Sequence, residues 1–286
     1  MPSLIDIRRR IRSVKNTQQI TKAMKMVSAA KLRRAQDRVI AARPYAATLR
    51  KVISNVAAAA AGDDRVSANP LLAQRPEKRV LLVLVSGDKG LAGAFNSNLI
   101  KAAVRFPAEH NGAEMTFELV GRKGRDFFRK RNARISGDQI GLAAKPSYEE
   151  TAAIARRAMK LFSDDEVDAV YMLYNEFKSV MTQKATLTRI LPVEVEAEQA
   201  AVDYIFEQPP GEMLESLLPR YVEMEFYRAL LESSAAEHAA RMTAMDAATN
   251  NAADVIDSLT LNMNRVRQAS ITKEIIEVVS GAAAAE

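Results

Sequence analysis

Apolar and small residues recur with heptad spacing near both ends of the chain. In each series the steps between positions alternate between three and four residues, which is typical of the seam of a supercoiled helix. The first series is Leu32, Ala35, Val39, Ala42, Ala46, Leu49, Ile53, Val56 and Ala60. The second is Leu231, Ala235, His238, Met242, Met245, Thr249, Ala252, Ile256, Leu259, Met263 and Val266. We therefore predict that the two end segments pair as a long antiparallel two-helix coiled coil.

The segment between the two series has a different pattern. Continuous apolar runs at residues 79–86, 115–120 and 167–174 predict buried strands, and residues 184–193 alternate like an edge strand. Helical patterns separate them at residues 94–105, 124–130 and 147–162. Such strand–helix alternation is typical of an α/β layer with a largely parallel sheet. The predicted fold is therefore α/β, with an inserted Rossmann-like α/β domain. We predict three parts: an N-terminal coiled-coil helix (1–60), a linker with the α/β globular domain (61–210), and a C-terminal coiled-coil helix (211–286). Residues 61–73 form the linker.

Polar residues interrupt both seams. In the N-terminal helix the seam positions hold Gln18, Thr21, Lys25 and Ser28, while Ile20, Met24 and Val27 fall beside them. Beyond Val266 the seam positions hold Ser270, Lys273 and Glu277, while Ile271, Ile275 and Val278 lie off them. We predict that both helices leave the two-strand register here and present an apolar stripe to another molecule. The alternative is a stutter in the supercoil with local repacking.

Charge distribution supports the pairing of the two ends. Residues 1–60 hold 14 Lys and Arg against two Asp, a net charge of +12, whereas residues 205–286 have a net charge of −7. A basic helix facing an acidic one favours pairing with each other over self-pairing.

Composition excludes several classes of chemistry. The chain has no cysteine, which excludes disulfides, thiolate catalysis and Cys-ligated metals, and only two histidines, which makes a histidine metal site a poor hypothesis. No apolar run reaches the roughly 18 residues that a membrane-spanning helix needs. Residues 5–25 are basic and amphipathic like a transit peptide, but the same pattern continues into the seam. The sequence therefore favours a cytosolic chain that starts at its own Met.

Three features were considered as candidate chemistry. The loop SGDKGLAG at residues 86–93 follows a strand and opens a helix, where phosphates often bind, but it matches neither common nucleotide motif. We interpret it as a tight turn. The basic residues 122–131 surround Phe127 and Phe128, and we expect a solvated face with both rings in the core. His238 lies on the seam and is expected to be a packed residue. The sequence therefore predicts no catalytic residue, no cofactor and no metal site.

Several motifs resemble those of the gamma subunits of F-type ATP synthases. The C-terminal segment RQASITKEIIEVVSGAA at residues 267–283 carries the most specific likeness. Others are NTQQITKAM at 16–24, RPY at 43–45, SGDKGLAGAFN at 86–96, ARM at 240–242 and AATN at 247–250. The likeness covers the whole chain in order.

The resemblance implies a rotating central stalk without a catalytic site of its own. The implied partners are three alpha and three beta subunits, epsilon, and the c-subunit ring, at the cytoplasmic face of the bacterial plasma (inner) membrane, to which the chain would be peripheral. Implied contacts with beta are Met24, Lys25, Arg267, Gln268, Thr272 and Glu274. Ile271, Ile275 and Val278 would lie in a hydrophobic bearing, and Tyr204, Phe206 and Glu207 would meet the c ring and epsilon.

Two other hypotheses remain. A basic coiled-coil protein that binds nucleic acid would explain the N-terminal charge, but not the acidic C-terminal helix. A nucleotide-dependent α/β enzyme would explain the central segment, but no catalytic constellation accompanies it.

Overall fold

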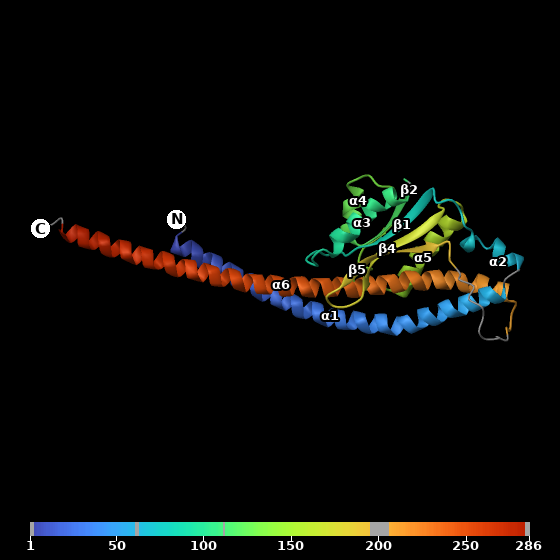
Figure 1. Ribbon diagram of the computed structural model, residues 1–286, viewed down its shortest axis with the longest axis horizontal. Helices are drawn as coiled ribbons and strands as arrows, with labels where there is room; N and C mark the ends of the chain where they lie inside the picture. The colour runs from blue at the N-terminus through green and yellow to red at the C-terminus, as the bar shows by residue number, and fades with distance from the viewer. Residues whose placement is uncertain (1–2, 61–62, 111, 195–205, 284–286) are drawn as a thin grey trace. The chain divides into compact units, whose positions relative to one another are not determined.

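The structure is a computed structural model that describes residues 3–60, 63–110, 112–194 and 206–283. The chain divides into two compact units, one formed by Met1–Ser28 with Met242–Glu286 and the other by Ala29–Arg241. Both long helices contribute to both units (Figure 1). The predicted domain boundaries at residues 60 and 210 stay a prediction.

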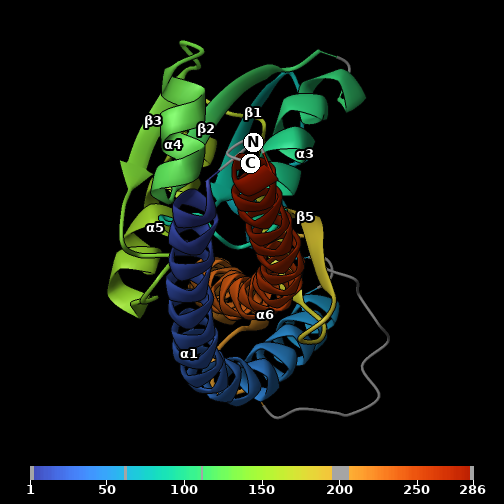
Figure 2. The ribbon, with the colours of Figure 1, turned by 90° about the vertical axis from the view of Figure 1, so that its left-hand side faces the viewer.

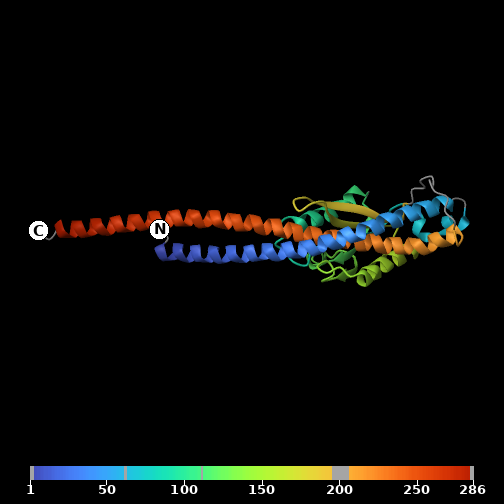
Figure 3. The same cartoon turned by 90° about the horizontal axis from the view of Figure 1, so that it is seen from below.

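The helix α1 spans Leu4–Ala59, and α6 spans Pro210–Ala283. Ser3 caps α1: its hydroxyl accepts the Asp6 N–H at 3.2 Å and donates to the Asp6 carboxylate at 2.8 Å. Pro44 lies inside α1 without ending it. Within each unit the two helices run side by side in opposite directions (Figure 3). No helix among the described residues is long and apolar enough to cross a membrane.

The larger unit contains one five-stranded sheet with the order β3-β2-β1-β4-β5. Its strands are β1 (Arg79–Val85), β2 (Glu114–Val120), β3 (Ile135–Gln139), β4 (Ala169–Phe177) and β5 (Gln183–Leu191). The first four are parallel, and β5 runs antiparallel to β4. The strands β3 and β5 form opposite edges of the sheet (Figure 2). The predicted α/β layer with a largely parallel sheet and an edge strand near residue 190 is confirmed.

Helices cover both faces of the sheet, which explains why β1 is apolar throughout. Leu81, Val83 and Val85 pack with α5 (Tyr148–Ser163) and with residues of α1 and α6 in one core. Alternate side chains point to the other face, where α3 (Phe95–Glu109) and α4 (Arg122–Arg129) lie (Figure 1). All of residues 80–85 are therefore buried.

Two local predictions were incomplete. Residues 61–73 were predicted to be a linker, but they contain the short helix α2 (Asp64–Ala68) and the 3-10 turn η1 (Pro70–Leu72). The side chains of Asp63 and Asn69 cap them by accepting backbone N–H groups at 3.0 Å. The strand β3 was not predicted, because its sequence ISGDQ lacks the apolar run of a buried strand and sits at a sheet edge.

Candidate interaction surface

The polar positions of the seam remain between the two helices. In the smaller unit the Thr249 hydroxyl lies 2.8 Å from that of Thr21, and the Gln18 amide donates to the Thr249 carbonyl at 3.5 Å. Lys25 Nζ lies 2.6 Å from Asp246 Oδ1. The prediction that α1 leaves the two-strand register is therefore wrong: hydrogen bonds and an ion pair replace apolar packing, and the register continues.

The apolar residues beside these positions point outward, as predicted. Ile20 is 60% exposed and Val27 is 56% exposed, whereas Thr21 is only 8% exposed. Met24, the third residue of the predicted set, is half-buried. This inverts the usual arrangement of a paired helix, in which apolar side chains face the partner and polar ones face water. The outer face of α1 in this unit thus presents isolated apolar side chains among its many basic residues.

The end of α6 has no partner helix among the described residues. Since Thr21 faces Thr249, the start of α1 at Leu4, 17 residues earlier, falls opposite Val266 (Figure 3). Beyond that point Ile271, Ile275 and Val278 are 49%, 57% and 72% exposed. Their spacing of four and three residues places them on one stripe of the helix. We call these three residues the apolar stripe of α6.

The residues predicted to contact beta form two separate groups. Met24 and Lys25 lie on α1 opposite Asp246, whereas Arg267, Gln268, Thr272 and Glu274 lie on α6 beyond the paired region. At 1.5 Å per residue the two groups are about 30 to 40 Å apart along the helix axis. The α6 group makes only local bonds: the Thr272 hydroxyl donates to the Gln268 carbonyl, and the Ser270 hydroxyl donates to Glu274. Their side chains are otherwise exposed.

The residues predicted to meet the c ring and epsilon precede α6. Tyr204 lies outside the described residues. Phe206 is half-buried and packs against the core of the larger unit, and Glu207 is exposed. Of these two side chains, that of Glu207 is the more accessible to solvent.

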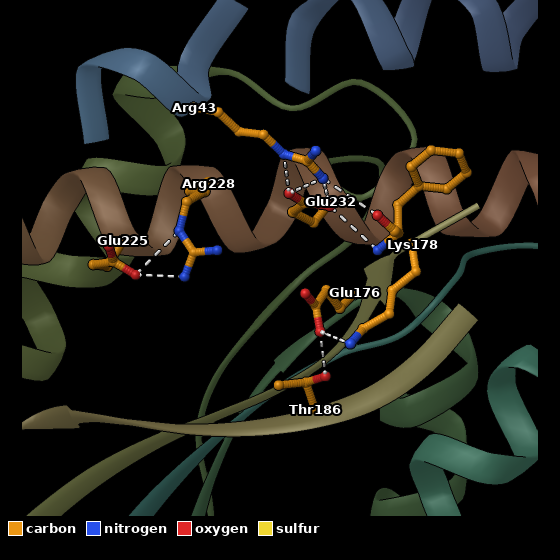
Figure 4. Close-up of polar contacts among 8 residues, drawn as sticks. Arg43, Glu176, Lys178, Thr186, Glu225, Arg228 and Glu232 are labelled. Atoms are coloured by element: carbon orange, nitrogen blue, oxygen red, sulfur yellow. Dashed lines mark hydrogen bonds and ion pairs between the residues drawn. The ribbon is translucent and has the colours of Figure 1, made fainter. Parts of the chain in front are cut away.

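A clamp that the sequence did not reveal ties α6 to α1 and to β4 in the larger unit. The buried Glu232 carboxylate accepts from the Arg43 guanidinium at 2.9–3.2 Å and from the Phe177 N–H at 3.2 Å (Figure 4). Arg43 also donates to the Phe177 carbonyl at 3.3 Å. One carboxylate, only 3% exposed, therefore connects three elements of the unit.

A second pair repeats this contact further along the same helices. The buried Glu225 carboxylate accepts from Arg50 at 3.1 Å and from Arg228 at 2.6 Å. The two arginines of α1 are seven residues apart, and so are Glu225 and Glu232. This equal spacing of basic residues on one helix and acidic residues on the other is a sequence signal. It could have predicted the Arg43–Glu232 and Arg50–Glu225 pairs.

The loop at residues 86–93 is closed by polar contacts within the larger unit. Gly87 lies against Glu237 of α6, whose carboxyl carbon would be 3.1 Å from a β-carbon at that position. Arg241 pairs with Glu237 at 2.5 Å and donates to the Gly90 carbonyl at 3.4 Å. Asp88 accepts the N–H of Arg122 at 3.0 Å and so caps α4. The Glu237 carboxylate therefore lies against the loop after β1, where a Rossmann-like sheet would hold phosphate, and this favours the tight-turn interpretation.

His238 is buried in the seam, as predicted. Burial, together with the nearby cations Arg241 and Lys31, lowers the pKa of His238 to about 4. Its ring Nδ1 lies 3.5 Å from Arg241 Nη1. At neutral pH the imidazole is thus an uncharged packing group.

The basic segment after β2 was predicted only in part. Phe128 is buried and stacks on Phe117 with ring centroids 4.3 Å apart, but Phe127 is half-buried under Arg131. One ring therefore belongs to the core, and the other lies at the surface.

Two long antiparallel helices that pair within each unit, together with a sheet covered on both faces, define a coiled-coil shaft protein with an α/β domain. The family profile described as "ATP synthase" matches residues 3–285. Over 286 residues, and the full length of both chains, the sequence is 75% identical to the ATP synthase gamma chain of Solibacter usitatus. It is 50% identical to that of Pelotomaculum thermopropionicum, again over the full length of both.

A solved structure agrees with these relatives. The central stalk and c ring of the mitochondrial ATP synthase of Tetrahymena thermophila includes a chain 26% identical to this one, with a TM-score of 0.61. The match covers 80% of this chain and 99% of that chain. The chain belongs to the ATP synthase family, and within it to the gamma chains. A gamma chain is a peripheral part of a membrane complex, and nothing in these comparisons supports the nucleic-acid hypothesis.

Proposed function

We propose that this chain is the rotating shaft that couples ion flow through a c-subunit ring to ATP synthesis and hydrolysis on an alpha–beta hexamer. Its partners would be three alpha and three beta subunits, epsilon and the c ring, at the cytoplasmic face of the bacterial plasma membrane. The chain would have no catalytic site of its own. The observation that carries this proposal is the exposed apolar stripe of α6, on a helix end that α1 does not cover.

The apolar stripe suits a contact that must slide. Burying apolar side chains is non-directional and has no fixed hydrogen-bond partner, so a helix surrounded by apolar walls keeps similar contact energy at every angle. A polar contact would favour particular angles because hydrogen bonds need defined geometry. Ile271, Ile275 and Val278 would therefore form a hydrophobic bearing at the end of the shaft.

The polar residues next to the stripe suit contacts that depend on the rotary angle. Arg267, Gln268, Thr272 and Glu274 would meet loops of a beta subunit, and Met24 with Lys25 would meet another part of beta lower on the shaft. An asymmetric rod that turns among three beta subunits would favour a different conformation in each one in turn. Tyr204, Phe206 and Glu207 would contact the c ring and epsilon.

Two arrangements within the larger unit support a structural role there. The Glu237 carboxylate lies against Gly87, in the loop where a phosphate would have to bind. The Arg43–Glu232–Phe177 clamp fastens α1, α6 and β4 to one another. A rotating subunit that transmits torque would need rigid connections of this kind between its elements.

A charge placed in the bearing tests the proposal. Ile275→Asp and Val278→Asp should lower the ATPase turnover of the purified complex several-fold, because the carboxylate would lose its hydration inside an apolar sleeve. Ile275→Leu should keep normal turnover. Met181→Asp, at a position that is 80% exposed in the larger unit, is the matched control.

Assembly must be measured on the same samples. Native mass should give three alpha and three beta chains per copy of this one for every variant, and the circular dichroism of the isolated chain should not change. Normal turnover of fully assembled Ile275→Asp complexes would contradict the bearing. Recovery of the chain without alpha and beta subunits would contradict the shaft itself.

A further inference from the structure

A groove on the outer face of the larger unit has no assigned role. It lies between α3 and α4 and encloses a volume of about 460 Å³. Its lining is formed by Ser97, Ile100, Lys101, Val104, Arg105 and Phe127. Val104 is 52% exposed, although it lies among apolar neighbours. The surface is therefore apolar at its centre and open to solvent.

The cations around the groove are not neutralised. Among the residues that the structure describes, Lys101, Arg105, Lys123 and Arg131 form no ion pair. In contrast, the nearby Arg125 and Arg129 pair with Asp126 and Asp138. Residues 95–109 and 122–131 together hold eight Lys and Arg against only Glu109 and Asp126. The groove thus has a rim of excess positive charge.

Charge and apolar surface repeat with helical spacing on both walls. On α4 and the turn after it, Phe127 lies four residues after Lys123 and four before Arg131. The Arg131 guanidinium carbon is 3.7 Å from the centroid of the Phe127 ring. On α3, Lys101 and Arg105 are four residues apart, and Ile100 and Val104 repeat the same step. A helix in the groove would meet apolar surface at its centre and cations one turn away on either side.

This pattern selects one kind of occupant. The apolar ridge of an amphipathic helix fits a concave apolar groove, and acidic side chains beside that ridge would reach the rim. A flat membrane surface would leave the groove floor uncovered, and a nucleic-acid backbone offers no apolar ridge to fill it. We propose that the α3–α4 groove is a docking surface for an acidic amphipathic helix of another protein subunit.

The proposal goes beyond the shaft function, because none of the contacts proposed above involves α3 or α4. It is tested in the complete complex, extracted from membranes with the full chain in place. The photo-reactive residue p-benzoylphenylalanine replaces Val104, and Ile140, an exposed residue of the same unit, receives it as the matched control. We expect position 104 to cross-link to a peptide that carries acidic residues and apolar residues spaced three or four apart.

Charge reversal then tests the rim. Lys101→Glu with Arg105→Glu should lower the cross-linking yield about tenfold, because two attractive contacts become repulsive. Lys145→Glu, outside the groove, should leave it unchanged. Both changes lie at exposed positions, and subunit composition by native mass shows whether the complex still assembles.

The outcomes separate the proposal from its rivals. Cross-links only to lipid or nucleic acid, to a peptide without the acidic amphipathic pattern, or to nothing in an assembled complex would each overturn it. A yield that charge reversal does not change would overturn the electrostatic part. Failure to recover any complex would instead contradict the proposed function and would be seen before cross-linking.

Discussion

The same two helices are built in opposite ways in the two units. Where α1 and α6 belong to the larger unit, seam residues such as Leu49, Ile53 and Leu231 are buried and two carboxylates are fixed by arginines. Where they belong to the smaller unit, threonines face each other and apolar residues face outward. The first arrangement stabilises the isolated chain. The second leaves apolar surface unused, which indicates contact with something outside the chain.

The free energy gained by burying an apolar side chain differs between the two units. Full burial of a Leu, Ile or Phe side chain stabilises a fold by about 1.5–3 kcal/mol. Phe226 in the larger unit gains this, since it is fully buried, whereas Ile275 at 57% exposure gains little from folding alone. The stability of the isolated chain therefore gives no reason for an isoleucine at position 275.

The largest effect should come from the clamp. Glu232→Ala leaves the Phe177 N–H without its acceptor and Arg43 without its carboxylate, and it should lower the free energy of unfolding by about 2–3 kcal/mol. Arg43 is half exposed, so water relieves part of the loss. Urea unfolding of the full chain measures it. Glu274→Ala, at an exposed position of the smaller unit, should stay within about 0.5 kcal/mol. Equal losses of unfolding free energy for Glu232→Ala and Glu274→Ala would contradict the proposed difference between the two units.

A pH-dependent effect should be confined to the larger unit. The pKa of His238 is about 4 in the fold and 6.5 when unperturbed, so the unfolded chain binds the proton first as pH falls. Its contribution is fully present above pH 6.5 and is lost toward pH 4, at up to about 1.4 kcal/mol per pH unit.

The measurement compares unfolding free energies of the wild type and His238→Gln between these two pH values. Subtracting the two curves separates the contribution of the histidine from that of all other titratable groups. Parallel curves would mean that His238 is not buried as described.

The smallest effect should come from the polar seam. Thr21→Val combined with Thr249→Val should change the stability of the chain by less than about 1 kcal/mol, because both hydroxyls disappear together. The Gln18 and Met245 carbonyls that also accept from these hydroxyls lie inside continuous helices. Thermal unfolding of the double variant, compared with the wild type, measures this. A loss above about 2 kcal/mol would show that the hydroxyl pair holds this unit together.

Much of the fold could be predicted from periodicity. The heptad series gave both long helices, and the apolar runs gave β1, β2 and β4 close to their observed limits. The strand β3 was missed because a polar edge strand has no apolar signal of its own. The polar seam was misread, because a pattern of polar residues does not show whether they face a partner helix or water.

For the candidate site, the sequence predicted which residues are exposed but not what they contact. Ile275 and Val278 were identified from the apolar pattern and the family motif, and they do lie uncovered on one stripe. What they touch stays a prediction. The Glu232 clamp and the α3–α4 groove were not predicted, because each depends on residues distant in sequence that converge from different elements.

By itself, the sequence determined the two paired helices, the α/β class of the inserted segment, the uneven charge and the family. These follow from local spacing and composition, which each segment carries wherever it packs. Only the tertiary structure decided that Thr21 faces Thr249, that the Glu237 carboxylate lies against Gly87 and that unpaired cations border Val104. Such pairings depend on register and distance between segments, and the geometry that brings them together exists only in the folded chain.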